Sequence, residues 1–192
     1  PLAAHLVETC AKVKESGADF GIVVDPDVDR LAFIDEKGEM YGEEYTLVTI
    51  ASYILQHKKG NTVSNLSSTR ALRDVTQQFG AEYFAAAVGE VNVVEKMKEV
   101  NAVIGGEGNG GVIYPHHQFC RDGGMSAATM LGLSAVRKTP ISELIAALPK
   151  FTMYQEKRKT SRAKEIVDHM REFFSDCPVD DRDGIRITKG GA

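Results

Sequence analysis

The sequence predicts an α/β fold: a layered α/β/α domain with a mixed sheet, flanked by partial segments of neighbouring domains. Short β-rich runs alternate with segments of helical periodicity over residues 20–137, which is typical of sheets covered by helices. The 192 residues are 43% apolar and 26% charged, as in ordinary globular domains. Beyond about residue 152 apolar residues become sparse, so a second unit is expected to begin there.

The first 42 residues are expected to supply one helix and a hairpin. Four residues recur at helical spacing, and the helix is expected to end at Gly17: Leu2, Leu6, Cys10 and Val13. FGIVVD is a β-rich run that predicts a buried strand, and LAFID, EKGE and MY predict a hairpin. One helix and so few strands do not make an independent sheet, so this segment is expected to be part of a larger domain.

Residues 43–151 contain a full alternation of helices and strands. Strands are expected at TVSNL, EYFAAAV, NAVIGG and VIYP. Helices are expected at residues 44–58, 69–79, 92–100, 122–137 and 141–148. A segment of this size can bury its own core.

The last forty or so residues have a different character. MYQEKRKTS is polar but strand-like, Ser161 is placed to cap a helix that runs through Phe174, and DGIRIT predicts another short strand. Few apolar residues are available to this part, so it is expected to be the start of a further domain.

Composition argues against several classes of protein. The net charge is −4 with no basic stripe, so nucleic acid is not an expected partner. No apolar run approaches the roughly 20 residues that span a bilayer, and no signal peptide is recognisable, so no membrane partner is expected. The cysteines are odd in number and widely spaced: Cys10, Cys120 and Cys177. This pattern favours a reducing, cytoplasmic compartment.

The segment FGIVVDPDVDRL carries aspartates at alternate positions: Asp25, Asp27 and Asp29. Like charges this close repel, so a cation is expected to compensate them. In an extended strand the outer two would lie roughly 13 Å apart, whereas one ion needs its ligands at about 2.0–2.6 Å. The segment therefore has to curl to hold one ion, which Pro26 favours. Carboxylates without sulfur or imidazole point to Mg²⁺, Mn²⁺ or Ca²⁺.

Three other interpretations of these aspartates stay open. An EF-hand calcium loop would place Glu36 at its twelfth position, but Arg30 stands where that loop needs glycine and the flanks are β-rich. A phosphatase of DxD type would use Asp25 as its nucleophile, and it needs neither a third aspartate nor an arginine. The last is an acidic surface turn that is merely solvated.

Arg30 is the candidate catalytic residue. A guanidinium beside a metal site can hold a phosphate through two parallel hydrogen bonds. Metal and arginine together point to a phosphorylated substrate or a phosphorylated side chain. A salt bridge from Arg30 to its own aspartates is the alternative.

The segment GGEGNGG, residues 105–111, has glycine at five of seven positions. It is expected to be a loop that lets the backbone come close to a ligand. The side chains that remain, Glu107 and Asn109, suit sugar hydroxyls, because one accepts hydrogen bonds and the other both donates and accepts. A plain tight turn is the alternative.

Together the two loops resemble those of the α-D-phosphohexomutase family, which comprises phosphomannomutases, phosphoglucomutases and phosphoglucosamine mutases. The stretch DPDVDR, residues 25–30, is similar to the family's metal loop, usually DGDxDR. The stretch GEGNGG, residues 106–111, is similar to its sugar loop, usually GE-x-S-G-[HG]. GEMYGEEYTL, SSTRAL, VGEVNVVEKM and DGIRI also resemble the family, in the right order.

The resemblance implies an isomerase that moves phosphate between the 1- and 6-positions of a hexose phosphate through a phosphoserine and a bisphosphate intermediate. It implies Mg²⁺ on the three aspartates, Arg30 steadying the transferring phosphoryl group, and Glu107 and Asn109 holding sugar hydroxyls. The implied substrate is mannose, glucose or glucosamine phosphate. The alternative function is a non-catalytic module that binds a divalent cation or carbohydrate.

The family's enzymes have four domains around one cleft. By resemblance, residues 1–42 are the C-terminal part of the metal-loop domain, domain two. Residues 43–151 are the sugar-loop domain, domain three, and residues 152–192 begin the C-terminal domain, domain four. The family's serine loop and terminal phosphate loop are not found in the sequence, so we expect a middle fragment that does not catalyse alone.

The loops depart from the family's usual pattern at three positions. Pro26 replaces glycine, Asn109 replaces serine, and Gly111 stands where many relatives have histidine. Four further polar residues receive no role from their pattern: Ser67, Glu90, His116 and His117.

Overall fold

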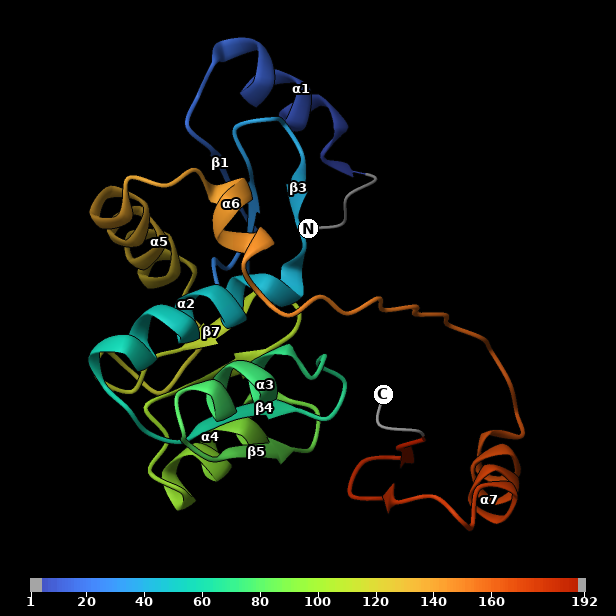
Figure 1. Ribbon diagram of the computed structural model, residues 1–192. Helices are drawn as coiled ribbons and strands as arrows, with labels where there is room; N and C mark the ends of the chain where they lie inside the picture. Colours follow the sequence, from blue (N-terminus) through green and yellow to red (C-terminus); the bar gives the residue numbers. More distant parts are fainter. Residues whose placement is uncertain (1–4, 190–192) are drawn as a thin grey trace. The chain divides into compact units, whose positions relative to one another are not determined.

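A computed structural model describes residues 5–189 of the chain. The chain forms two compact units, Pro1–Phe151 and Thr152–Ala192, which are described in turn (Figure 1). Within the described residues, no helix combines the length and apolar character needed to cross a membrane.

The first unit opens with a helix and a three-stranded antiparallel sheet. Helix α1 (Val7–Ser16) ends at Gly17, whose φ of 64° is left-handed, as the sequence predicts; Leu2 lies outside the described residues. Strands β1 (Gly21–Val24), β2 (Leu31–Ile34) and β3 (Met40–Tyr41) pair in that order, which confirms the expected hairpin.

The prediction that β1 is a buried strand was wrong. β2 is wholly buried, whereas β1 alternates between half-buried and exposed positions. β1 pairs only with β2 among the described strands, and as an edge strand it leaves Ile22 and Val24 exposed at 43% and 41%. Hydrophobicity cannot distinguish a covered strand from an edge strand, because the covering element lies elsewhere in the chain.

The second sheet is mixed, as predicted, with the order β5-β4-β6-β7. Strands β4 (Thr62–Asn65), β5 (Tyr83–Ala86) and β6 (Ile104–Glu107) are parallel, and β7 (Gly111–Ile113) runs antiparallel to β6. The register pairs Thr62 of β4 with Ile104 of β6. The carboxyl ends of the three parallel strands therefore meet at one edge of the sheet.

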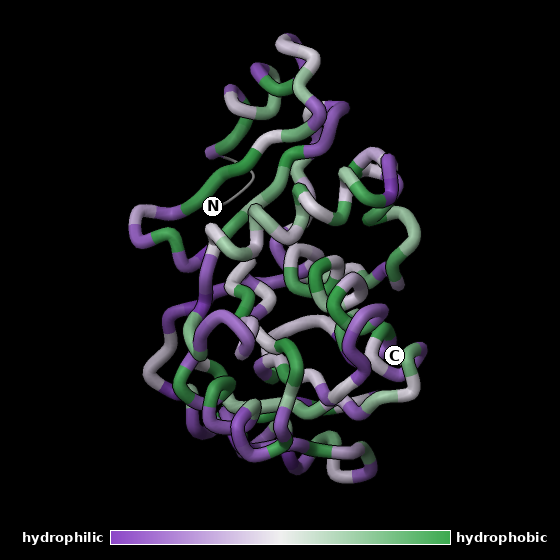
Figure 2. Tube along the Cα trace, turned by 90° about the vertical axis from the view of Figure 1, so that its left-hand side faces the viewer, coloured by the Kyte–Doolittle hydropathy of each residue, from purple (hydrophilic) through white to green (hydrophobic). Residues whose placement is uncertain are grey.

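Helices cover both faces of this sheet, which gives the expected α/β/α layers. Helices α2 (Glu43–His57) and α3 (Ala71–Gln78) pack with Ile104 and Val112 in one core. Helix α4 (Glu90–Glu99) packs through Val93 and Met97 against Val63 and Ile113 on the other face. Figure 2 shows hydrophilic and hydrophobic residues interspersed along the trace. Helices α3 and α4 bury only some of their positions, whereas α2 buries a continuous run over residues 46–51.

A third core joins the two sheets of this unit. Helices α5 (Gly123–Arg137) and α6 (Ile141–Ala146) bury Met130, Leu133 and Ile141 with Leu31 and Phe33 of β2. Tyr45 and Tyr53 of α2 pack against this core and also against the core of the second sheet. Helix α2 is thus shared, and the two sheets form one unit.

The glycine-rich segment is more ordered than the predicted loop. Gly105, Gly106 and Glu107 belong to β6, and Gly111 begins β7, so the segment is a tight hairpin. A side chain at Gly105 would lie 2.8 Å from the carbonyl oxygen of Val63. Glycine is needed here because strand and helix atoms pack closely, a requirement that composition alone does not reveal.

Two backbone hydrogen bonds join the aspartate loop to the rest of the unit. Leu31 N donates to Gly110 O at 3.2 Å, and Gly123 N donates to Val28 O at 2.9 Å. Gly110 has a φ of 89°, and a Cβ there would overlap the carbonyl oxygen of Leu31. The close approach of the two loops therefore requires glycine at position 110.

In the second unit, described as far as residue 189, the chain forms one helix and one small hairpin. Helix α7 (Ala163–Phe173) is preceded by Arg162, which makes no side-chain cap, so the prediction of a Ser161 cap was wrong. Strand β8 (Val179–Asp180), which was not predicted, pairs with β9 (Arg186–Ile187) in the predicted DGIRIT strand. The expected strand at MYQEKRKTS is absent: residues 151–160 have no regular structure. A strand needs a pairing partner, and none of the described strands pairs with this segment.

The approach of the two loops can be tested at Gly110. We expect Gly110→Ala to lower the free energy of unfolding by about 2 kcal/mol or more, because a left-handed φ and a backbone overlap act together. Gly132→Ala is the matched control: Gly132 lies in α5 with nothing within 4 Å of an added Cβ, so alanine should stabilise by up to about 1 kcal/mol. Urea unfolding measures both, and equal effects would contradict the close approach.

A second test concerns Glu36, which lies in the turn between β2 and β3. Its carboxylate accepts a hydrogen bond from the Ser142 hydroxyl and another, at 3.3 Å, from Ser142 N. Burial favours the neutral carboxyl, but these donors outweigh it and hold the pKa of Glu36 below its ordinary value. This contribution to stability is present above about pH 4.5 and is lost as the pH falls through the lower folded-state pKa.

We therefore expect Glu36→Gln to cost about 1 kcal/mol at pH 7 and to remove part of the acid-dependent loss of stability. Ser142→Ala, which removes the donor hydroxyl, should do the same. Unfolding measured between pH 3 and pH 7 checks this, and an unchanged pH profile in both variants would rule the contact out.

Candidate active site

The predicted site residues follow the ends of β1, in the first sheet, and of β6, in the second sheet. Asp25 follows β1, Asn65 closes β4, and Glu107 closes β6. In open α/β sheets, ligands bind outside the carboxyl ends of the strands.

The aspartate loop curls as a single-ion site requires. One carboxylate oxygen from each of Asp25, Asp27 and Asp29 lies within 4.8 Å of the others. The curl comes from a turn in which Val28 N donates to Asp25 O at 3.1 Å and Val28 takes a φ of 58°. Three carboxylates with no sulfur or nitrogen ligand form a donor set that fits a hard cation such as Mg²⁺. The flanking elements are strands, which argues against the EF-hand interpretation.

Arg30 turns back onto its own loop. Its Nε donates to Asp25 Oδ2 at 2.6 Å and lies 3.3 Å from Asp29 Oδ1, while its backbone N donates to Asp25 Oδ1 at 3.1 Å. The internal salt bridge considered as an alternative is therefore present. The side chain remains 43% exposed, so part of the guanidinium can also face a ligand.

The pKa values of Asp25 and Asp29 shift in opposite directions. Burial favours the neutral form of Asp25, but the backbone and guanidinium donors of Arg30 outweigh it and lower the pKa of Asp25. Burial raises the pKa of Asp29, and the charges of Asp25 and Asp27 add to this, while the attraction of Arg121 offsets only part of it. The donors of Arg30 thus decide the direction of the pKa shift at Asp25, and burial decides it at Asp29.

Glu107 is a buried carboxylate held by donors from three segments. Its residue is 4% exposed. Oε1 accepts from Asn65 Nδ2 at 2.8 Å and from Gly89 N at 3.1 Å, and Oε2 accepts from Arg121 Nη1 at 2.6 Å. Asn109 lies beside it, with Nδ2 3.5 Å from Glu107 Oε2. A sugar hydroxyl can reach this carboxylate only by exchanging with, or adding to, these donors.

Arg121 was not singled out from the sequence, yet it contacts both loops. Its guanidinium contacts Asp29 Oδ2, lies 2.6 Å from Glu107 Oε2 and 3.4 Å from Glu90 Oε2, and is itself 17% exposed. Its backbone N donates to Glu90 Oε1 at 2.7 Å. The available signal was an arginine just before Asp122, the residue that caps α5 by accepting from Met125 N, but nothing in that pattern names its partners.

The turn between β6 and β7 is lined by further polar groups that the sequence did not assign. Gly108 N donates to Ser68 Oγ at 2.9 Å, and Glu44 accepts from Thr69 N at 3.0 Å. A Cβ at Gly108 would overlap the Glu44 carboxylate, so that carboxylate lies directly against the turn. Burial raises the pKa of Glu44.

The four polar residues without an assigned role have separate positions. Ser67 Oγ donates to Asn65 Oδ1 at 3.1 Å, and Asn65 Nδ2 in turn donates to Glu107 Oε1. The carboxylate of Glu90 lies beside the guanidinium of Arg121. His117 lies 3.2 Å from Asp122. His116 contacts Lys58, and neither of these histidines belongs to the aspartate group.

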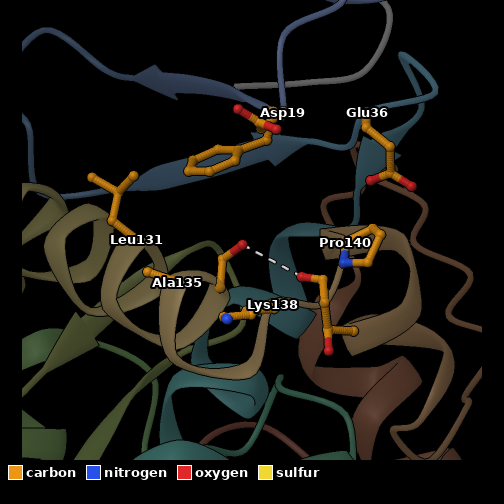
Figure 3. A pocket seen from close by; sticks show the side chains of 9 residues that line it. Asp19, Glu36, Leu131, Ala135, Lys138 and Pro140 are labelled. Atoms are coloured by element: carbon orange, nitrogen blue, oxygen red, sulfur yellow. Dashed lines mark hydrogen bonds between the residues drawn. The ribbon is translucent and has the colours of Figure 1, made fainter.

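A separate hollow of about 500 Å³ lies away from these loops. Figure 3 shows it between the start of β1 and the end of α5, with Leu131 and Ala135 on one side and Asp19 and Glu36 above. Ser134 Oγ donates to Thr139 O at 3.4 Å across it. None of the predicted site residues lines it, so it is not the site described above.

Comparisons with known proteins agree with this arrangement. Residues 42–151 match the family model for phosphoglucomutase/phosphomannomutase, alpha/beta/alpha domain III, and residues 1–38 match that for domain II. A probable phosphoglucosamine mutase of Methanopyrus kandleri is 31% identical over 97% of this chain and 42% of its own length. A phosphoglucomutase/phosphomannomutase of Thermococcus kodakarensis is 35% identical over 91% of this chain and 39% of its own length.

Solved structures share the fold. A phosphoglucomutase/phosphomannomutase family protein from Burkholderia thailandensis superposes with a TM-score of 0.82 at 24% identity, covering 96% of this chain and 40% of that one. An N-acetylphosphoglucosamine mutase of Aspergillus fumigatus, solved with GlcNAc-6P and magnesium, gives 0.50 at 12% identity, covering 86% and 44%. The chain spans about two fifths of the length of the curated relatives it matches. Because a family model covers more than half of its residues, the chain belongs to the phosphoglucomutase/phosphomannomutase family, the α-D-phosphohexomutases.

Proposed function

We propose that the complete protein containing this chain moves phosphate between the 1- and 6-positions of a hexose phosphate, through a phosphoserine and a bisphosphate intermediate. The observation that carries the proposal is the meeting of the aspartate loop, which follows β1 of the first sheet, with the hairpin between β6 and β7 of the second sheet. Three aspartate oxygens gather within 4.8 Å, and Glu107 and Asn109 lie on the neighbouring hairpin, joined to them through Arg121. Family membership and the relatives' names support the same reaction class.

We further propose a boundary for each domain. Residues 1–42 form the C-terminal part of domain two, residues 43–151 form domain three, and residues 152–192 begin domain four. The matched ranges of the two family models support the first boundary, and the compact unit that begins at Thr152 supports the second.

The aspartates are proposed to hold Mg²⁺. Their oxygen-only donor set fits this ion, and the Aspergillus fumigatus relative was solved with magnesium. A divalent ion supplies positive charge that stabilises a transferring phosphoryl group. Asp25 is kept ionised by Arg30, so it is ready to bind a cation, and Arg30 itself is proposed to steady the phosphoryl oxygens with its exposed side.

The hairpin of β6 and β7, which carries Glu107 and Asn109 and is called the sugar hairpin below, is proposed to bind the substrate. Asn109 is half-buried, and its amide can exchange its 3.5 Å contact with Glu107 for a hydroxyl. Glu107 is held rigidly by its donors, so it presents its oxygens in a fixed place, and fixed placement is what phosphoryl transfer requires. The substrate is proposed to be a mannose, glucose or glucosamine phosphate, and the free cysteines fit a cytoplasmic, reducing location.

The cation site predicts the behaviour of Asp27→Ala. In the complete protein we expect this change to lower kcat by about 100-fold or more, because charge neutralisation at the phosphoryl group is lost. Asp74→Ala is the control: Asp74 pairs with Arg73 on α3 and should leave kcat unchanged. Steady-state assays with Mg²⁺ and each hexose phosphate measure this. Near-normal turnover by Asp27→Ala would remove the aspartates from the mechanism.

The sugar hairpin predicts a graded effect of two substitutions. Asn109→Ala should lower kcat/KM about 10-fold with little change in stability, because it removes one ligand contact. Glu107→Ala should lower kcat/KM further and also lower the melting temperature, because three buried protein donors lose their acceptor. If both variants kept the parent's kcat/KM for every hexose phosphate, the hairpin would be a structural turn only.

A further inference from the structure

Arg121 is the one residue whose side chain contacts carboxylates of both proposed loops among the ion pairs of the described residues. Each of its three guanidinium nitrogens faces a different carboxylate: Nη2 faces Asp29, Nη1 faces Glu107, and Nε faces Glu90. This arrangement uses the planar fork of arginine in full, which an ammonium group cannot reproduce.

The three contacts are unequal. Nη1 hydrogen-bonds to Glu107 at 2.6 Å, while Nε is buried without a hydrogen bond in the described residues and lies 3.4 Å from Glu90 Oε2. The contact between Arg121 Nε and Glu90 is therefore the one that can shorten. At 17% exposure its charge is poorly screened by water, so a change at one partner is felt by the others.

A cation on Asp29 would be such a change. Asp29 contributes an oxygen to the group of carboxylates within 4.8 Å of one another, and it is the member of that group that Arg121 contacts in the described ion pairs. When an ion neutralises Asp29, Arg121 is attracted less to Asp29 and relatively more to Glu90 and Glu107. Glu107 in turn holds Gly89 N through its other oxygen, at 3.1 Å.

We propose that Arg121 is a positioning residue that couples cation binding at Asp29 to the placement of Glu107, and so to sugar binding at the hairpin. The identities of the cation and the sugar rest on the proposed function. The coupling itself rests on the contacts of Asp29, Arg121 and Glu107.

The amide of Gly89 is a specific reporter of this coupling. A second link between the loops exists, the bond from Leu31 N to Gly110 O at 3.2 Å, but it leads to the turn of the hairpin. Gly89 is reached through Glu107 and through its neighbour Glu90, and both of these contact Arg121. A signal at Gly89 therefore reports the route through Arg121.

The first experiment measures amide chemical shifts in the ¹⁵N-labelled 192-residue chain. Asp29→Asn removes the charge that a cation would neutralise, and we expect the Gly89 amide to shift. In an Arg121→Gln background the same change should leave Gly89 unmoved. Asp27→Asn is the matched control, because Asp27 lies in the same loop but is not paired with Arg121 in the described contacts, and it should leave Gly89 unmoved.

Arg121→Lys provides a second background that keeps the charge. It should fail to transmit the shift, because one ammonium cannot face three carboxylates at once. A Gly89 shift that persists in the Arg121→Gln background, or that Asp27→Asn produces equally, overturns the proposal. A full Gly89 shift in the Arg121→Lys background overturns the proposal as well, because the coupling depends on the three nitrogens of the guanidinium group.

The second experiment measures the Kd of a hexose phosphate for the complete protein with and without Mg²⁺. We expect Mg²⁺ to change this Kd about fivefold or more, within the usual range of coupling between two sites, and Arg121→Gln to bring the ratio close to one. Arg73→Gln, which removes a surface charge paired with Asp74, should keep the parent's ratio.

The outcomes separate the two proposals. An unchanged ratio in Arg121→Gln, with both ligands still binding, overturns the coupling and leaves the proposed function standing. Failure of the parent to bind Mg²⁺ or any hexose phosphate overturns the proposed function, and the coupling to a sugar with it.

Discussion

The crowding of carboxylates where loops of the two sheets meet is the constraint on which the site depends. Asp25, Asp27 and Asp29 lie within reach of a single ion, and Glu90 and Glu107 approach the same arginine. Buried carboxylates are costly unless they are paired. Arg30 pairs with Asp25 and Asp29, and Arg121 joins Asp29 to Glu90 and Glu107, so two guanidinium groups hold together carboxylates that repulsion would otherwise separate. The proposed divalent cation would add the positive charge that these two arginines do not supply.

Much of the fold was predictable because local patterns agree with it. The helices of residues 43–151 and their strands follow from periodicity and glycine stops, and the mixed sheet follows from their alternation. Two of the errors share one cause. The exposure of β1 and the absence of a strand at residues 152–160 depend on which partner a segment meets, and a local pattern carries no information about partners. The Ser161 error is local: α7 begins at Ala163, so Arg162 and not Ser161 occupies the N-cap position.

The candidate site also contains residues that local sequence patterns indicate and residues that they do not. The alternate aspartates and the pair Glu107 and Asn109 could be found because their residue types are unusual in such close spacing. Arg121 could not, because one arginine before a helix is common and its three partners come from distant parts of the chain. The sequence also does not reveal that the glycine-rich segment is a closely packed hairpin. Glycines that permit close packing cannot be distinguished in a sequence from glycines that permit a loop.

The sharing of α2 between two cores has a consequence for how the molecule can be divided. Family models place a border between residues 38 and 42, but Leu31, Phe33 and Tyr41 are buried with residues of α5 and α6. A polypeptide that begins at residue 43 would leave that apolar surface bare to water. The border between the two family models therefore divides one hydrophobic core. A chimaera of two family members should therefore take β2 and β3 from the same parent as α5 and α6.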